Sequence, residues 1–357
     1  MTNKTTLGGK YAFLFFFIAL TGMLSSCAHT PPIKSDNGVA SLEKVTLGGA
    51  EQWILIRGKD VSNPIMLFIH GGPGFPEMAF NHHFGDGLEE RFIVVHWDQR
   101  GAGKSYGKAP EGSFTVEQHL SDAHELIEML LDRFGKKKLY IVGHSWGSMM
   151  GVMLVKRYPE LFHAYVGIGQ VVDLERNEAV SYDFVLREAR RRNNRKAISE
   201  LEKIGPPPYE EHNELVTQRK WLLKFGGALH NEDGYGKYAK IALKTGHEYS
   251  PADYIKLIMG ATKVPKLMWE EMSRINFIEQ APRLEVPVYF FAGRYDYNTP
   301  FELVEEYYEI LEAPRGKHLV WFENSAHSPN LEEPAEFTRA MVELVLAQTY
   351  PGNNRTE

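Results

Sequence analysis

A Gly-His-Ser-Trp-Gly pentapeptide at residues 143–147 directly follows the apolar run Leu139–Val142 and precedes a stretch rich in Met, Val and Leu. A Gly-x-Ser-x-Gly sequence between a buried strand and a helix is typical of a nucleophile elbow. The two glycines permit a sharp strand-to-helix turn, because a Cβ at either position would clash in that corner. The motif therefore predicts a chain of alternating strands and helices in which the Ser145 side chain stands exposed at a strand tip.

A serine hydroxyl is a good nucleophile only when a base removes its proton. The base and the acid that orients it are expected downstream, the acid first and the histidine second. Asp296 follows the predicted strand 288–292, and His327 follows the predicted strand 318–322. Side chains just past the carboxyl ends of parallel strands converge on one crevice. We therefore predict His327 as the general base and Asp296 as its orienting acid, with Asp173, which follows the preceding predicted strand, as the alternative acid.

Such chemistry also requires two hydrogen-bond donors that stabilise the oxyanion. The backbone N–H of Trp146 is one candidate, because it lies at the N-terminus of the predicted helix after the nucleophile. The second donor is expected in residues 70–74, His-Gly-Gly-Pro-Gly, which directly follow the predicted strand Ile65–Ile69. Glycines there let main-chain N–H groups approach the developing charge closely. We rank Gly72 first and Gly71 second as the donor.

Three motifs in chain order carry a resemblance to a known family. They are residues 70–74, residues 97–105 (Trp-Asp-Gln-Arg-Gly-Ala-Gly-Lys-Ser) and residues 143–148 (Gly-His-Ser-Trp-Gly-Ser). Together they resemble the α/β-hydrolase branch that contains the prolyl iminopeptidases, enzymes that remove N-terminal proline or other residues from peptides. The resemblance covers roughly residues 42–171 and 286–347.

The resemblance implies an α/β-hydrolase fold and carries the family's catalytic serine, aspartate and histidine onto Ser145, Asp296 and His327. It also implies an aminopeptidase that cleaves small peptides. Two departures favour an alternative, a carboxylesterase of small esters on the same machinery. The chain has His144 where the peptidases usually have glycine, and it lacks the Trp-Glu and Arg-Ile-Glu stretches that hold the substrate amine in well-known members. A non-catalytic receptor on this fold would predict an incomplete triad, whereas all three residue types are present.

The remaining pattern alternates strands and helices, which indicates a mostly parallel twisted sheet flanked by helices. The clearest helix is Thr115–Phe134, where apolar residues recur at helical spacing. A second helix is expected over Gly147–Arg157 and a final one over Pro334–Ala347. The predicted strands are a hairpin within Leu42–Arg57, then Ile65–Ile69, Phe92–His96, Leu139–Val142, Tyr165–Val171, Val288–Ala292 and His318–Phe322.

The N-terminus has the pattern of a lipoprotein signal peptide. Lys4 and Lys10 precede an uncharged, mostly apolar run of 14 residues, 11–24, which is shorter than a membrane-spanning helix. Leu-Ser-Ser-Cys at 24–27 looks like a bacterial lipobox, so Cys27 is the predicted lipidation site. This predicts an exported protein of the bacterial cell envelope, anchored to the membrane through Cys27. An ordinary cleaved signal peptide and an uncleaved anchor are the alternatives.

The segment between the predicted strands 165–171 and 288–292 is polar, rich in charge and aromatics, and helical in tendency, which indicates a helical cap over the site. Its aromatic residues either line the substrate pocket or form the cap's own core. The candidate pocket residues are Trp221, Phe225, Tyr235, Trp269 and Glu270. The predicted organisation is signal peptide 1–26, tether 27–41, first core part 42–172, cap 173–280, second core part 281–350 and tail 351–357.

Composition and spacing exclude several other functions. The formal net charge of −6 argues against nucleic acid as a partner. Gly-Lys-Ser at 103–105 lacks the earlier glycine of a phosphate-binding loop, because Asp98 stands at that position. The His82–His83 pair lies in a polar loop without further ligand residues at metal-binding spacing. We therefore expect no cofactor and no metal, and a small peptide or ester as substrate.

Overall fold

The structure is a computed structural model that describes residues 28–85, 87–209, 212–232 and 234–350. The predicted signal peptide 1–26, Cys27 and the tail 351–357 lie outside the described residues. Eight strands form one sheet in the order β1-β2-β4-β3-β5-β6-β7-β8. β2 is antiparallel to both of its neighbours, and all other neighbouring strands are parallel. The predicted mostly parallel sheet is therefore confirmed.

The strands lie close to their predicted positions. Their bounds are β1 Val39–Leu47, β2 Ala50–Gly58, β3 Ile65–Ile69, β4 Ile93–Asp98, β5 Leu139–His144, β6 Phe162–Ile168, β7 Val288–Gly293 and β8 Lys317–Phe322. β6 differs most from its prediction, since it begins and ends three residues earlier than Tyr165–Val171. It ends where Gly169 takes a positive φ of 50°, a backbone conformation that no regular strand contains.

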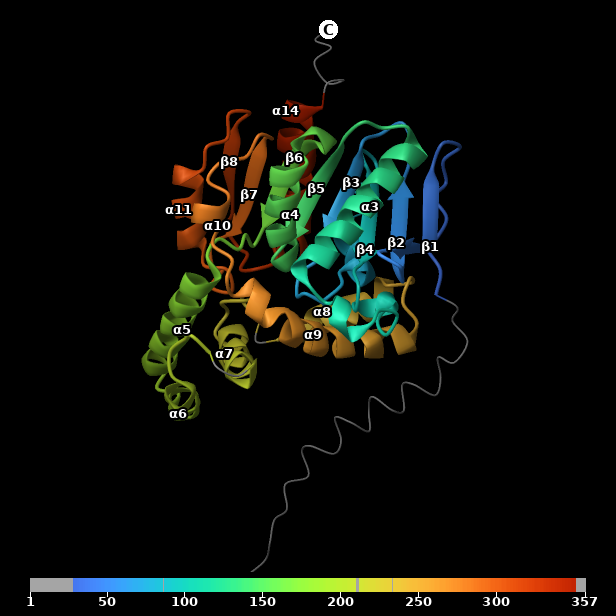
Figure 1. Cartoon of the computed structure of the whole chain (residues 1–357). Coiled ribbons are helices and arrows are strands. Elements are labelled where there is room, and N and C mark those ends of the chain that lie inside the picture. Colours follow the sequence, from blue (N-terminus) through green and yellow to red (C-terminus); the bar gives the residue numbers. More distant parts are fainter. Residues whose placement is uncertain (1–27, 86, 210–211, 233, 351–357) are drawn as a thin grey trace, which may run out of the picture.

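Helices cover both faces of the sheet (Figure 1). Alternate residues of β3 enter different cores: Leu67 and Ile69 pack with α3 and α4, whereas Met66 and Phe68 pack with the opposite layer. The flanking helices are α2 Asn81–Phe84, α3 Val116–Phe134, α4 Trp146–Arg157, α11 Phe301–Ile310, α12 Pro329–Glu332, α13 Pro334–Arg339 and α14 Ala347–Thr349. The predicted final helix is divided, because residues Ala340–Leu346 between α13 and α14 form a π-helix.

Six helices lie among the described residues between β6 and β7, and Figure 1 shows α5 to α9 gathered at one end of the sheet. They are α5 Leu174–Arg191, α6 Arg195–Ile204, α7 His212–Lys224, α8 Gly236–Thr245, α9 Pro251–Met272 and α10 Phe277–Gln280. The longest, α9, begins with a capping box in which Ser250 and Asp253 satisfy each other's backbone N–H groups. Its buried residues Val264 and Met268 join the core on the α3 and α4 side of the sheet.

The first described residues pack against the body of the protein. Arg57 forms a buried ion pair with Glu89 at 2.7 Å and donates to the Pro31 carbonyl at 2.7 Å. His29 donates its backbone N–H to the carbonyl of His247, between α8 and α9, at 3.1 Å. β1 begins at Val39, inside the segment predicted as a tether, because its residues pair with β2 from that position on.

Among the described residues, no helix has the length and apolar character needed to cross a membrane. The apolar run 11–24 lies outside those residues.

Candidate active site

The turn at residues 143–147 connects β5 to α4 and holds Ser145 in a strained conformation. Ser145 has φ 54° and ψ −116°, a combination that residues with a side chain rarely adopt. Its N–H donates to the Ile168 carbonyl at 2.9 Å, and the Ser148 hydroxyl donates to the Ser145 carbonyl at 2.6 Å. A Cβ on Gly143 would overlap the carbonyl of Gly147. Gly143 and Gly147 are therefore required because backbone atoms approach this turn too closely for a side chain at either position. This tight turn is what exposes the Ser145 side chain.

His327 and Asp296 lie together in the loops after β8 and β7. Asp296 Oδ2 accepts a hydrogen bond from His327 Nδ1 at 2.9 Å. The other carboxylate oxygen, Oδ1, accepts from the backbone N–H groups of Asn298 at 2.8 Å and Thr299 at 2.9 Å. This bonding fixes the Asp296 carboxylate, which in turn orients the imidazole so that its other nitrogen, Nε2, is the one left to act as base.

The alternative acid, Asp173, has a different role in the structure. Its side chain accepts from the backbone N–H of Arg176 at 3.1 Å and caps the N-terminus of α5. No hydrogen bond within the described residues links Asp173 to His327. The geometry therefore brings Asp296, and not Asp173, to the imidazole.

Ser145 and His327 line one cavity of about 510 Å³ between the sheet and the cap. Burial lowers the pKa of His327, and the neighbouring Asp296 carboxylate only partly offsets this effect, so the pKa lies below 6.5. The imidazole is therefore neutral at pH 7 and able to accept a proton. Among the described residues, no hydrogen bond joins the Ser145 side chain to the His327 side chain. Contacts of this kind are often long in the absence of substrate and shorten in the complex.

The candidate oxyanion donors line the same cavity. Trp146 is the first residue of α4, so its N–H has no acceptor within the helix. Gly71 packs against Ser145, since a Cβ there would lie 3.1 Å from Ser145 Cβ. Gly72 has φ 115°, and a Cβ there would lie 2.7 Å from the N atoms of Gly74 and Phe75. Only glycine fits at Gly72, which lets the main chain approach the space in front of Ser145 closely.

A buried ion pair not predicted from the sequence lies beside the predicted base. His144 Nδ1 bonds Glu77 Oε1 at 2.5 Å, and Asn330 donates to Glu77 Oε2 at 2.8 Å. Burial lowers the pKa of His144, but the Glu77 carboxylate outweighs this effect and the pKa is raised. The ring of His144 lies 4.8 Å from that of His327, and its Nε2 bonds the His327 carbonyl at 2.9 Å. In the sequence, the one sign of this pair was His144, which stands where the prolyl iminopeptidases usually have glycine.

A second charged pair from the cap lines the cavity. Arg219 Nη2 donates to Glu178 Oε1 at 2.5 Å, and Asn177 donates to the same oxygen at 3.3 Å. The Glu178 carboxylate is buried, and its Oε2 has no hydrogen-bond partner among the described residues. A buried carboxylate oxygen without a donor is costly, and the Glu178–Arg219 pair places one negative and one positive group in this wall of the cavity.

Two of the five predicted pocket residues line the cavity and three do not. Tyr235 and Trp269 line it. Trp221 belongs instead to the core between α5, α6 and α7, because its ring packs inward on Phe225 at 5.6 Å. Glu270 is 85% exposed and pairs with Arg274 at 2.6 Å, because it lies on the outer face of α9. The predictions for Trp221, Phe225 and Glu270 were therefore wrong.

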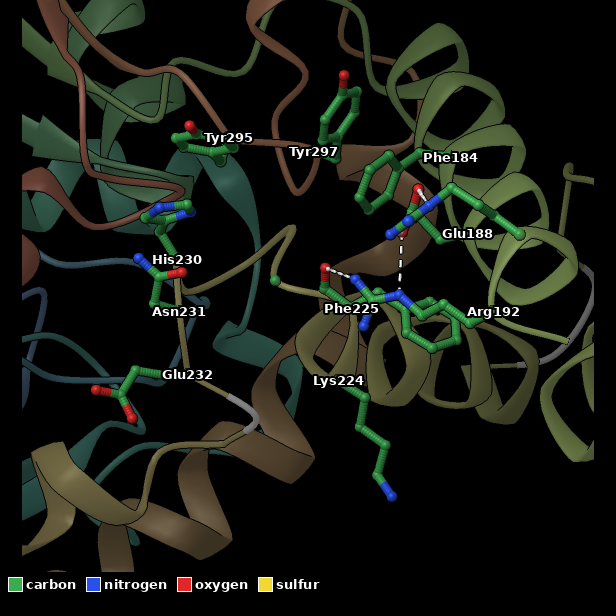
Figure 2. A pocket seen from close by; sticks show the side chains of 12 residues that line it. Phe184, Glu188, Arg192, Lys224, Phe225, His230, Asn231, Glu232, Tyr295 and Tyr297 are labelled. Carbon is green, nitrogen blue, oxygen red and sulfur yellow. Dashed lines mark hydrogen bonds and ion pairs between the residues drawn. The ribbon is translucent and has the colours of Figure 1, made fainter. Parts of the chain in front are cut away.

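Phe225 lines a separate surface pocket of about 500 Å³ (Figure 2). Two stacked ring pairs lie at its edge, His230 on Tyr295 at 3.7 Å and Phe184 on Tyr297 at 3.8 Å. Its arginines belong to the basic segment 187–196 and are paired with the Glu188 carboxylate, as the dashed line from Arg192 shows. These two exposed arginines, Arg191 and Arg192, are thus paired with a neighbouring carboxylate on the same helix end.

The loop that carries His327 is fixed by one buried carboxylate. Glu332 Oε1 accepts from the N–H groups of Ala326 at 3.0 Å and Ser328 at 3.1 Å, on either side of His327. Its Oε2 accepts from the N–H of His230 at 2.6 Å. Burial raises the pKa of Glu332 to about 7, although these three N–H groups favour the charged form.

Glu332→Gln is therefore expected to change how stability depends on pH. The raised pKa means that the carboxyl group stabilises the fold fully below its ordinary pKa of 4.5, and that this contribution is lost as the pH rises towards 7. Relative to the variant, wild type is expected to lose about 2–3 kcal/mol of unfolding free energy across that interval. Urea unfolding of both proteins across this pH range measures the difference, and a constant difference would contradict the assignment.

No group of three or more His, Cys, Asp or Glu side chains in the described part of the chain is arranged to hold a metal ion.

Comparisons with known proteins agree with this architecture. Residues 64–334 match the family model described as alpha/beta hydrolase fold. A "Probable aminopeptidase YbaC" from Bacillus subtilis is 34% identical over 311 residues, which cover 87% of this chain and 97% of the relative. A "Proline iminopeptidase" from Saccharolobus solfataricus is 23% identical over 292 residues, covering 80% and 85%. Curated relatives also include epoxide hydrolases.

Among solved structures, a "proline iminopeptidase-related protein" from Thermus thermophilus superposes with a TM-score of 0.63 at 21% identity, covering 88% of this chain and 99% of the other. At that identity the likeness concerns the fold. The matched model spans most of the chain, and the chain belongs to the alpha/beta hydrolase family, with relatives named as aminopeptidases.

Proposed function

We propose that this hydrolase is a serine enzyme in which Ser145, His327 and Asp296 form the catalytic triad. The observation that carries the proposal is the His327–Asp296 hydrogen bond of 2.9 Å beside a cavity that also contains the strained Ser145. An epoxide hydrolase that used a carboxylate nucleophile would need an acid at the elbow, whereas this chain has a serine there.

In the proposed mechanism, neutral His327 accepts the Ser145 proton as the hydroxyl oxygen attacks the substrate carbonyl carbon. The N–H groups of Trp146 and Gly72 donate to the resulting oxyanion. The imidazolium then protonates the leaving group, which departs and leaves an acyl-enzyme. A water molecule, deprotonated by His327, hydrolyses the acyl-enzyme and restores the serine.

We further propose that the substrates are small peptides with a free N-terminal amine, as for a prolyl-iminopeptidase-type aminopeptidase. The cavity walls carry two buried carboxylates, Glu77 and Glu178, and a carboxylate is the partner that an ammonium group requires. The relatives named aminopeptidase support the same substrate class.

The experiment that tests this substrate class compares aminoacyl-anilides, including the proline anilide, with short acyl nitrophenyl esters. The proposal expects turnover of the anilides, and loss of that turnover when the amine is acetylated. Cleavage of the esters alone would overturn it and leave the carboxylesterase.

Glu178→Gln is expected to weaken binding of the substrate amine. Removing the charge should raise KM for aminoacyl-anilides by about 10- to 100-fold, because a charge-assisted hydrogen bond contributes roughly 1.5–3 kcal/mol. The KM for an acyl ester without an amine should change little. Steady-state kinetics with both substrates measure the two effects, and Glu270→Gln on the exposed face of α9 is the control that should alter neither. An equal rise in KM for both substrates would contradict amine recognition by Glu178.

We also propose that the chain is exported and anchored through a lipid on Cys27. The support is the sequence pattern of residues 11–27. Mass analysis of the purified membrane fraction tests this, since lipidation removes residues 1–26 and adds acyl chains to Cys27.

A further inference from the structure

Exposed apolar side chains gather on the outer face of the cap. Helices α8 and α9 carry five of the large hydrophobic residues that are markedly exposed: Leu243, Ile255, Ile258, Met259 and Leu267. Ile255, Ile258 and Met259 are spaced three and four residues apart, so they form one stripe along α9. Figure 1 shows α9 directly below the end of the sheet, and its buried Val264 and Met268 join the core there, so the exposed stripe lies on the opposite, solvent side of this helix. The stripe is therefore an apolar strip directed to solvent.

The same two helices are rich in lysine, although the whole chain has a net charge of −6. Six lysines lie on α8 and α9: Lys237, Lys240, Lys244, Lys256, Lys263 and Lys266. Lys240, Lys244 and Lys266 are exposed and form no ion pair with any described residue. We call the five apolar residues and these six lysines together the α8–α9 face.

The three acidic residues of these two helices all have partners, and exposed Glu270 pairs with Arg274 at 2.6 Å. Asp253 forms ion pairs with Lys104 at 2.9 Å and with Lys256 at 3.0 Å. Glu271 accepts a hydrogen bond from the backbone N–H of Val116 at 2.8 Å. The α8–α9 face therefore presents a positive charge around an apolar centre.

The chain enters the described structure beside this face. His29 is bonded to the carbonyl of His247, two residues after the end of α8, and Pro31 is fixed by Arg57. Residues 1–27, which contain the apolar run 11–24 and Cys27, therefore connect to the body next to the α8–α9 face. A membrane anchor in that segment would hold this side of the protein at the bilayer.

We propose that the α8–α9 face is a docking surface for an anionic lipid bilayer. Lysines around exposed Ile, Leu and Met side chains match the headgroup boundary of such a membrane, where cations meet phosphates and apolar groups enter below them. A second copy of the chain fits less well, because a two-fold contact would bring the lysines of one face against those of the other.

Docking would place the catalytic cavity one helix away from the lipid. Ala261, Pro265 and Trp269 line the cavity from α9, whose outer residues form the docking face. The membrane would thus lie against the outer side of the cap, on the helix that also bounds the substrate. This inference does not depend on which substrate the enzyme cleaves.

A fluorescence experiment tests the proposal on the full chain. Cys27 is the only cysteine, so Cys27→Ser provides a background for single labelled cysteines. A polarity-sensitive dye is placed at Met259→Cys or at Ile310→Cys, two positions that are equally exposed at 46% but lie on α9 and α11. With phosphatidylcholine vesicles that contain phosphatidylglycerol, the emission at 259 is expected to shift to the blue, whereas that at 310 stays unchanged.

Charge variants then distinguish membrane binding through the α8–α9 face from membrane binding through residues 1–27, because residues 1–27 are identical in every protein tested. The triple variant Lys240→Gln, Lys244→Gln, Lys266→Gln should lower the ratio of vesicle-bound to free protein by about 100-fold. Each lysine near an anionic surface raises that ratio by roughly a factor of five. Three results would overturn the proposal: equal dye responses at both positions, an equal response with neutral vesicles, or a blue shift at 259 that grows with protein concentration without vesicles. The last result would indicate a second copy on the face.

Discussion

Replacement of Ser145 by alanine is expected to lower kcat by on the order of 10⁶-fold, with the fold preserved. The Ser145 hydroxyl oxygen is the only atom of the proposed catalytic residues that forms a covalent bond to the substrate, so its loss removes the acyl-enzyme route altogether. Alanine keeps the Cβ and fits the same turn, whose geometry depends on Gly143 and Gly147 rather than on the hydroxyl. Activity towards the substrate of choice, with circular dichroism as the test of folding, measures the effect.

A covalent probe makes this experiment independent of the unknown substrate. A fluorophosphonate that reacts with activated serines should modify wild type once, at Ser145, and should not modify Ser145→Ala. Ser273→Ala, at the C-terminal end of α9 on the cap, is the matched control and should be labelled like wild type. Undiminished turnover or labelling in Ser145→Ala would refute the nucleophile assignment.

Much of the sheet could be predicted because its strands are short apolar runs that end at turn-forming residues. Residues 65–69 are such a run and form β3 without adjustment. The end of β6 could not be predicted in the same way, because the apolar residues Val171 and Val172 follow only two positions, Gly169 and Gln170, after the strand. Hydrophobicity reports burial, and these two residues are buried outside the sheet. The positive φ of Gly169 ends the strand, and a glycine alone does not specify its backbone angles.

The cap shows a different limit of prediction. Trp221 and Trp269 are both aromatic residues on cap helices, yet the first packs in the core of the cap and the second lines the cavity. Helical spacing specifies which residues share a face, but not which neighbour that face meets. The pairs Glu77–His144 and Glu178–Arg219 depend on contacts between residues 67 and 41 positions apart, which no local pattern encodes.

Replacement of Asp296 by asparagine is expected to lower kcat by about 10⁴-fold at neutral pH, because the amide can stabilise the wrong imidazole tautomer and cannot stabilise the imidazolium. The pH profile adds a second readout. In wild type, kcat/KM should fall as the pH drops through the pKa of His327, which burial holds below 6.5. The Asp296 carboxylate raises that pKa, so its removal should move the acid limb of the residual activity to lower pH.

Asp173→Asn is the matched control, because the sequence left both aspartates as candidates for the acid. Asparagine caps a helix about as well as aspartate, so α5 should keep its N-terminal hydrogen bond from Arg176. This variant should therefore retain nearly full kcat and the acid limb of wild type. If activity collapsed in Asp173→Asn and survived in Asp296→Asn, the carboxylate bonded to His327 would not be the one that the reaction uses. The 2.9 Å contact predicts the opposite order.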